Sequence, residues 1–353
     1  MIQCRYLFIC IIYEEKTMLS EYLKLARSFN MTLTGLAPVM GALAMGQHNP
    51  LMLFLLFMVG CLGHAYGFTH NDIIDYQHDI HVAEIAGRPI VKGTVSKKQA
   101  WMFALLCLSL AFLLAAYLSI STHQYLPLVV FCIPVLCVTL YNYIGKLLPY
   151  TDVILGIGMF FLIFWGAIIQ TNGLQQINLI GWVICVLGAI QVLYMNLVAG
   201  GLKDIEHDTQ KKAHTTAVRL GVRVVHKDLF IPRRFTLIAF TVQFLNIFAA
   251  FLPFVLDRFF RTSSLLMYLQ LGLLSLASLG LFSLVYELLS LKQFERAIIR
   301  RLIGVQYYIN FCLAPILLLR ITSWAVVLVF IPALGFIVSN LILHEKFMEP
   351  EVM

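Results

Sequence analysis

The sequence predicts an all-α fold, a polytopic transmembrane helical bundle. Of its 353 residues 60% are hydrophobic and only 12% are charged, whereas a soluble domain carries roughly 25% charged residues. Long stretches contain no Asp, Glu, Lys or Arg at all. Because about 20 apolar residues are enough to cross a bilayer, these stretches predict membrane spans.

The first three charge-free stretches, 28–71, 99–145 and 153–202, are each long enough for two spans. We expect an apolar helix at each end of a stretch, with a short polar connection between the two. The predicted helices lie near residues 31–46, 51–70, 101–119, 125–144, 153–170 and 177–199.

Four shorter charge-free stretches predict one span each. The last two are separated only by residues 320–323, so they are either two spans or one broken hairpin. The bundle therefore has nine or ten spans. The four helices are expected near residues 236–256, 264–286, 302–319 and 324–343.

The basic residues predict the orientation of the bundle. With the N-terminus inside, all but Arg258, Arg261 and Arg320 of the 25 lysines and arginines fall on loops or tails of one side. The positive-inside rule makes that side cytoplasmic. We expect an integral protein of the cell (plasma) membrane whose active site faces the cytoplasm. The net charge of +7 follows from this topology, so nucleic acid is not an expected partner.

The chain is expected to form one transmembrane domain over residues 19–345, with a C-terminal tail at 346–353. Residues 1–18 read as a leader, and Met18 is the expected native start. Residues 19–27 form an amphipathic stretch suited to the membrane interface. The spans repeat as two four-helix halves, each with an acidic cluster and a cytoplasmic cap loop, 72–98 or 203–234, after its second span.

Two acidic clusters carry the chemistry. In a helix, Asn71, Asp75 and Asp79 follow one another at i, i+4 and i+8, and Asp204 and Asp208 at i and i+4, so each set lines one helix face. Membrane segments seldom keep carboxylates without a use. Oxygen ligands suit Mg²⁺, which is usually held by one or two carboxylates together with substrate phosphates. The predicted metal ligands are Asn71, Asp72, Asp75, Asp79, Asp204 and Asp208.

Basic residues in the same loops fit a diphosphate. Arg and Lys form charge-assisted hydrogen bonds with phosphate oxygens, and the candidates are Arg88, Lys92, Lys146 and Lys203. Metal-assisted loss of diphosphate from an allylic lipid leaves a carbocation that an acceptor captures. A membrane-embedded cavity keeps that cation from water. The expected catalytic residues are Asp75, Asp79, Asp204, Asp208 and Lys146.

The order and spacing of these motifs over about residues 19–320 resemble the UbiA superfamily of intramembrane prenyltransferases. The resemblance implies a polyprenyl diphosphate donor, Mg²⁺ at both acidic clusters, and short cytoplasmic helices at 72–98 and 203–226. The chain departs from the pattern in lacking a Pro after Arg27, in its longer segment beyond residue 320, and in an insertion at 230–234. The motifs are Asn71-Asp72-x-x-Asp75-x-x-x-Asp79, then Gly87-Arg88-Pro89, Tyr141 to Lys146, and Asp204-x-x-x-Asp208 with Thr215 to Gly221.

The acceptor stays open between an aromatic, quinone-precursor-like ring and a polar lipid, such as the glyceryl phosphate acceptor of archaeal ether-lipid synthesis. A non-catalytic isoprenoid-binding or transport protein is the alternative from another class. Transporters usually hold ionisable groups near the bilayer midplane, whereas both clusters lie at one edge of the bundle. This placement favours the enzyme.

Overall fold

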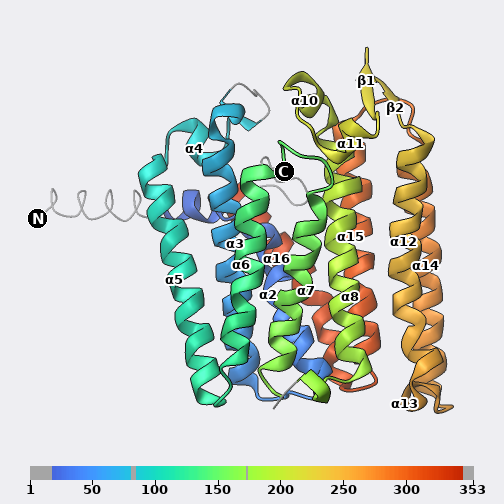
Figure 1. Cartoon of the computed structure of the whole chain (residues 1–353). Coiled ribbons are helices and arrows are strands. Elements are labelled where there is room, and N and C mark those ends of the chain that lie inside the picture. The colour runs from blue at the N-terminus through green and yellow to red at the C-terminus, as the bar shows by residue number, and fades with distance from the viewer. Residues whose placement is uncertain (1–17, 81–84, 172–173, 345–353) are drawn as a thin grey trace, which may run out of the picture.

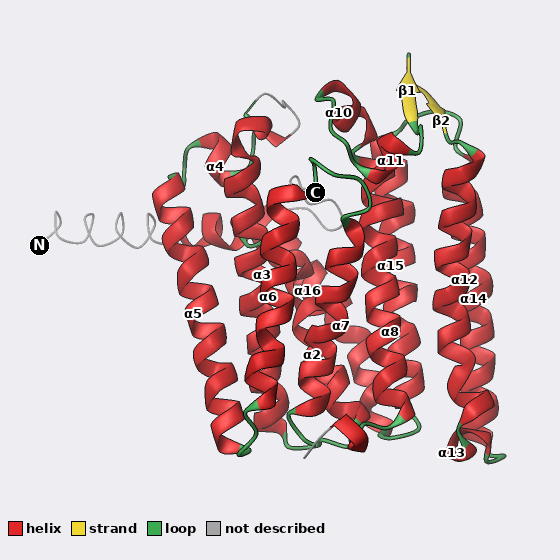
Figure 2. Cartoon of the chain, in the orientation of Figure 1, coloured by secondary structure: helices red, strands yellow, loops and turns green. Residues whose placement is uncertain are grey.

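A computed structural model describes residues 18–80, 85–171 and 174–344 as a bundle of long helices (Figures 1 and 2). The all-α prediction is confirmed. Each of the ten predicted spans coincides with a helix of the described chain, and eight of these helices are long and apolar enough to cross a membrane. The expected leader at 1–17 and the tail at 346–353 lie outside the described residues.

The helices at the ten predicted positions run alternately up and down the bundle (Figure 1). Two of them are short: α2 has 14 residues and α7 has 17. Their bounds are α2 Met31–Ala44, α3 Pro50–Asp79, α5 Lys97–Ser121, α6 Leu126–Ile144, α7 Asp152–Ile168, α8 Leu179–Tyr194, α12 Arg233–Leu256, α14 Leu265–Ser290, α15 Arg296–Leu318 and α16 Val326–His344.

Local signals fix where these helices begin. The Asn49 side chain accepts hydrogen bonds from the backbone N–H groups of Leu51 and Met52, with Pro50 at the first turn of α3. At the start of α5, Ser96 and Gln99 form a reciprocal capping box. Polar residues between apolar stretches therefore set the helix boundaries.

The elements that follow both acidic clusters gather at the same end of the bundle, which we call the acidic end (Figure 1). They include a β-hairpin that the sequence analysis did not predict. Its turn residues His226 and Lys227 both have positive φ, at 49° and 73°. Asn-Gly usually occupies such a turn, so His-Lys gives no sequence signal. These elements are α4 Pro89–Lys92, α9 Gly201–Lys203, α10 Ile205–Gln210, α11 Thr216–Arg219, β1 Arg223–Val225 and β2 Asp228–Phe230. The short helix α13, Arg258–Arg261, lies at the opposite end.

The hairpin ties two loops together at the acidic end. The Leu229 N–H donates to the Lys292 carbonyl at 2.7 Å, and the Phe294 N–H donates to the Lys227 carbonyl at 2.7 Å. The loop between α14 and α15 is thereby held beside the second acidic cluster, and with it the first residues of α15.

The first and last described segments of the chain pack against each other. Residues 18–25 are helical. The buried Leu25 belongs to one hydrophobic cluster with Ile73 and Ile90, so protein covers this side of the predicted amphipathic stretch. The C-terminal helix α16 is separate from α15 and packs on α2 and on the 3₁₀ turn η1, Ser28–Asn30. The Ser28 and Ser339 hydroxyls lie 2.8 Å apart.

Helices α2 and α7 approach each other through glycine. A Cβ built on Gly166 would lie far inside contact distance of the Pro38 carbonyl oxygen, and one built on Gly41 would do the same with the Ile163 carbonyl. Small residues let membrane helices come this close. Because the contacted atoms are backbone, no side-chain movement relieves the clash.

We predict that Gly166→Ala destabilises the protein by about 1–3 kcal/mol or more, the cost of overpacking a filled interface. The matched control is Gly272→Ala, on α14, where an added Cβ meets nothing within 4 Å and helix propensity favours Ala by about 0.5–1 kcal/mol. Thermal unfolding in detergent measures both. Equal midpoints for the two variants would contradict the close α2–α7 packing.

Candidate active site

The first acidic cluster lies in the last turns of α3, which runs as one helix from Pro50 to Asp79. Asn71, Asp75 and Asp79 form one i, i+4, i+8 row, as predicted, and the Asn71 Nδ2 donates to Asp75 Oδ2 at 3.3 Å. The side chains of Asp75 and Asp79 are only 9% and 5% exposed. Such burial of carboxylates requires pairing.

Two arginines from distant segments meet at Asp72. Its Oδ1 accepts from Arg27 Nη2 at 2.8 Å and from Arg88 Nη1 at 3.3 Å. The same Arg88 nitrogen donates to Asp79 Oδ2 at 2.5 Å. Arg88 therefore bridges two carboxylates of α3, as a residue at the start of α4 can when the chain turns back at this end of the bundle.

Lys146 holds Asp75 and also connects the two clusters. Its Nζ lies 2.7 Å from Asp75 Oδ2. Its backbone carbonyl accepts from the N–H of His214, beyond the second cluster, at 3.0 Å. From the other direction, Lys211 Nζ lies 3.8 Å from Asp79 Oδ1. The segments that carry the two clusters thus lie side by side at the acidic end.

The second cluster follows an irregular helix. After α8 the chain forms a π-helix, Met195–Gly200, then the short α9, and the regular helix ends before Asp204. The second cluster therefore lies on a separate short helix, α10, with Asp204 at its N-cap and Asp208 within it. The i, i+4 relation survives, because the Asp208 N–H still donates to the Asp204 carbonyl at 2.9 Å. π-Helical turns often occur at functional sites.

Asp204 and Asp208 differ in environment. The Asp204 side chain is 39% exposed and accepts from Arg296 Nη2 at 2.9 Å. Asp208 is buried, and its Oδ2 accepts from the Thr215 hydroxyl at 2.9 Å. Burial, with a further contribution from the negative charge of Asp204, raises the pKa of Asp208 to about 6.

Of the predicted basic residues, Arg88 and Lys146 contact the clusters directly, and Lys203 Nζ lies 3.5 Å from Asp204 Oδ2. Lys92 is exposed at the end of α4. Its positive charge lowers the pKa of Glu21, which belongs to neither cluster. The sequence analysis missed Arg27 and Arg296. Both lie at the acidic end, on the side where the positive-inside rule alone leads one to expect basic residues, so neither was distinguished as a site residue.

The donors of this site fit Mg²⁺ and a diphosphate. Carboxylate and amide oxygens are hard ligands of the kind Mg²⁺ prefers. In the described part of the chain, no three carboxylate, imidazole or thiol side chains form a ready metal site, because the carboxylates face basic side chains instead. The buried Nε atoms of Arg27 and Arg88 have no hydrogen-bond partner among the described residues, so two donors remain for an anion.

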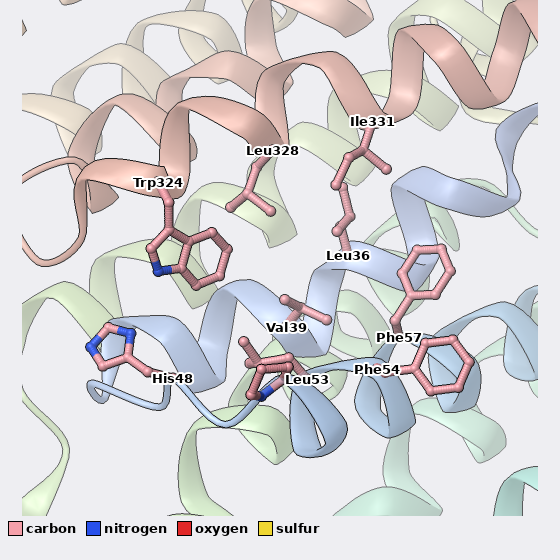
Figure 3. A pocket seen from close by; sticks show the side chains of 10 residues that line it. Leu36, Val39, His48, Leu53, Phe54, Phe57, Trp324, Leu328 and Ile331 are labelled. Atoms are coloured by element: carbon pink, nitrogen blue, oxygen red, sulfur yellow. The ribbon is translucent and has the colours of Figure 1, made fainter.

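A cavity of about 610 Å³ lies at the other end of the bundle and is distinct from this site. It runs between α2, α3 and α16, with Trp324 and His48 at one end and Leu36 and Ile331 at the other (Figure 3). Its walls are almost entirely apolar, and no acidic-cluster residue lines it. Among the described residues that line it, His48 is the one titratable side chain, and none is a carboxylate, Lys or Arg.

Comparison with known proteins places the chain among prenyl-transferring enzymes. The model of the UbiA prenyltransferase family matches residues 31–297. The digeranylgeranylglyceryl phosphate synthase of Pyrococcus furiosus is 28% identical over 235 residues, which cover 66% of this chain and 76% of that protein. The enzyme of the same name from Thermococcus gammatolerans is 28% identical over 209 residues, 58% of this chain and 71% of its own length.

Solved structures share the fold. A UbiA homologue from Archaeoglobus fulgidus, bound to GPP and Mg²⁺, aligns with a TM-score of 0.58 and 15% identity, over 83% of this chain and 98% of that one. The apo structure of a UbiA homologue from Aeropyrum pernix K1 aligns with a TM-score of 0.61 and 16% identity, over 86% of this chain and 98% of that one.

We predict that Asp208→Asn stabilises the ligand-free protein, and does so more at pH 7.5 than at pH 4. The raised pKa means that the folded state holds a proton between about pH 4 and 6 that the unfolded state has released, so the wild-type stability contribution falls as pH rises through that window. A shift to about 6 corresponds to about 2–3 kcal/mol. Unfolding midpoints in metal-free buffer test this, with Glu206→Gln on the same helix as control. A difference independent of pH would contradict it.

Proposed function

The chain belongs to the UbiA prenyltransferase family and is a prenyltransferase of the membrane, and from this premise we propose that it transfers a prenyl group from a polyprenyl diphosphate to a phosphorylated polar lipid, with Mg²⁺. The relatives named digeranylgeranylglyceryl phosphate synthase favour an acceptor of the glyceryl phosphate type over an aromatic ring. The prenyl diphosphate donor accords with the GPP-bound Archaeoglobus fulgidus homologue.

The observation that carries this proposal is the pairing of buried carboxylates with two partly buried arginines, each of which has a buried Nε–H without a hydrogen-bond partner among the described residues. Asp75, Asp79 and Asp208 supply oxygen ligands from two segments that converge, as does the half-exposed Asp204. The unused Nε–H groups of Arg27 and Arg88 suit the oxygens of a diphosphate. A site for a metal ion alone would not need the arginines, and a site for an anion alone would not need the carboxylates.

Each group has a task in the proposed reaction. Bound Mg²⁺ would neutralise charge on the diphosphate as its bond to the prenyl carbon breaks. Asn71, Asp72, Asp75 and Asp79 from α3, with Asp204 and Asp208, would hold the metal. Arg88 and Lys146 would orient the diphosphate and stabilise the charge that develops on it.

We predict that Asp75→Asn and Asp208→Asn each lower kcat at least 100-fold while the protein still folds. A carboxylate that holds the metal acts mainly in the transition state, when charge accumulates on the leaving group. Lys146→Ala should raise the KM for prenyl diphosphate and leave the Mg²⁺ requirement visible, since its proposed contact is to phosphate. Mass spectrometry of the product from a labelled prenyl diphosphate measures all three.

The matched control is Lys92→Ala, which removes an exposed loop charge outside the paired clusters and should leave turnover unchanged. Parallel reactions with a glyceryl phosphate lipid and with an aromatic acid identify the acceptor. Wild-type turnover by the two Asp variants, or activity in excess chelator, would overturn the metal mechanism. Product from the aromatic acid alone would overturn the lipid acceptor.

We also propose that the acidic end faces the cytoplasm, as the positive-inside distribution indicates. In a cysteine-free variant, a single Cys at Gly93 or Lys211 should react with a membrane-impermeant reagent only after the membrane is opened, in right-side-out vesicles. A Cys at His123, in the loop between α5 and α6 at the opposite end, should react at once. Reaction of all three from one side contradicts this topology.

A further inference from the structure

Arg27 has a backbone conformation that is unusual for an arginine. Its φ of 47° and ψ of 52° lie in the left-handed region, which costs a non-glycine residue about 1–2 kcal/mol. Such a residue persists only where surrounding contacts hold it, and often occurs at functional sites. Arg27 terminates the first helical stretch and begins η1, so this conformation determines where its guanidinium points.

The contacts that hold Arg27 come from a second row on α3. His64, Phe68 and Asp72 follow one another at i, i+4 and i+8, beside the carboxylate row of Asn71, Asp75 and Asp79. Asp72 Oδ1 accepts from the guanidinium at 2.8 Å, and the guanidinium carbon Cζ lies 4.8 Å from the centroid of the Phe68 ring. His64 Nε2 lies 3.3 Å from the Arg27 carbonyl oxygen. We call His64, Phe68 and Asp72, with Thr34 of α2, the arginine socket.

The hydrogen bonds of the socket fix the tautomer of His64. The Arg27 carbonyl can only accept, so His64 Nε2 must carry the proton and donate. His64 Nδ1 then has no proton and accepts from the Thr34 hydroxyl, 2.8 Å away. The imidazole is buried and its ring centroid lies 4.4 Å from that of Phe68. Thr34 therefore orients His64, and His64 anchors the backbone of Arg27.

We propose that Thr34 and His64 are positioning residues for Arg27, which they hold in the left-handed conformation so that its guanidinium meets the diphosphate beside Asp72. This inference rests on the proposed function. His64 does not touch the acidic clusters itself and acts only through the Arg27 carbonyl. The socket thus couples the α2–α3 interface, inside the membrane, to the charge of the acidic end.

Loss of the His64 donor frees the Arg27 carbonyl and lets the backbone return to an ordinary conformation. The guanidinium then leaves its place, and a charge-assisted hydrogen bond to the diphosphate is lost. Such bonds carry enough free energy for a roughly 10-fold to 100-fold change in affinity. Binding of the diphosphate group should weaken, whereas the step that breaks the prenyl bond should change less.

Two substitutions separate the roles of the imidazole nitrogens. The amide nitrogen of His64→Gln stands as many bonds from Cα as Nε2 does, so it retains a donor to the Arg27 carbonyl. His64→Asn places its amide at the level of Nδ1, within reach of Thr34 alone. We expect the Kd for inorganic diphosphate with Mg²⁺, measured by calorimetry, to rise at least 10-fold in His64→Asn and His64→Ala, and by less than threefold in His64→Gln.

A double-mutant cycle with Arg27→Ala decides whether His64 acts through Arg27. In the Arg27→Ala background, His64→Ala should cause no further change in the Kd for diphosphate. The control is His70→Ala, a buried histidine on the same helix that binds Asn142 instead; it should alter thermal stability and leave the Kd within twofold of wild type.

The outcomes distinguish the positioning role from the proposed function. Additive effects of His64→Ala and Arg27→Ala, or equal losses in His64→Gln and His64→Asn, overturn the positioning role even if wild-type protein turns over prenyl diphosphate. A wild-type protein that binds diphosphate, shows the non-additive cycle and yields no prenylated product would instead retain the socket and overturn the proposed transfer reaction.

Discussion

Compensation of buried negative charge organises the acidic end of this bundle. Buried carboxylates there are tolerated only when each meets a positive or hydrogen-bonding partner. The partners come from segments far apart in sequence: Arg27 before α2, Arg88 at α4, Lys146 after α6, Lys211 after α10 and Arg296 at α15. These pairs therefore join the end of α3 to the segment before α2, to α4, to the end of α6 and to α10, and join α10 to α15. Removal of one partner leaves an uncompensated charge, which is strongly destabilising.

The same arrangement prepares the site for its proposed ligands. A metal ion is positive and a diphosphate is negative. The carboxylates can therefore release their basic partners and bind the metal, while the basic residues bind the diphosphate, and the charges stay balanced. Burial raises the pKa of Asp208, whose side chain accepts from the neutral Thr215 hydroxyl. A metal bound beside this carboxylate would favour its ionised form.

Below the acidic end, packing and neutral hydrogen bonds hold the helices. Gly41 and Gly166 bring α2 and α7 into backbone contact. On the other side of the bundle, the Asn310 Oδ1 accepts from both Gln243 and Asn246 of α12, and its carbonyl accepts from Gln191 of α8. Interhelical hydrogen bonds of this kind join helices where lipid offers no hydrophobic driving force. Packing against α2, α5 and α6 positions α3, which carries both the carboxylate row and the row of His64, Phe68 and Asp72.

Sequence by itself determined the fold class, the positions of the spans and the row of Asn71, Asp75 and Asp79, because apolar length and helical periodicity are local properties of the chain. Tertiary structure alone decided the rest. It showed that Arg27 and Arg296 reach the carboxylates, that Lys92 does not, and that a π-helix breaks the segment before Asp204. Long-range ion pairs depend on which helix ends meet in space, and the positive-inside rule gives every inner-end arginine the same explanation. The proposed role of His64 could not be predicted for the same reason, since the function of a single histidine in an apolar span depends on which carbonyl its ring faces in the folded protein.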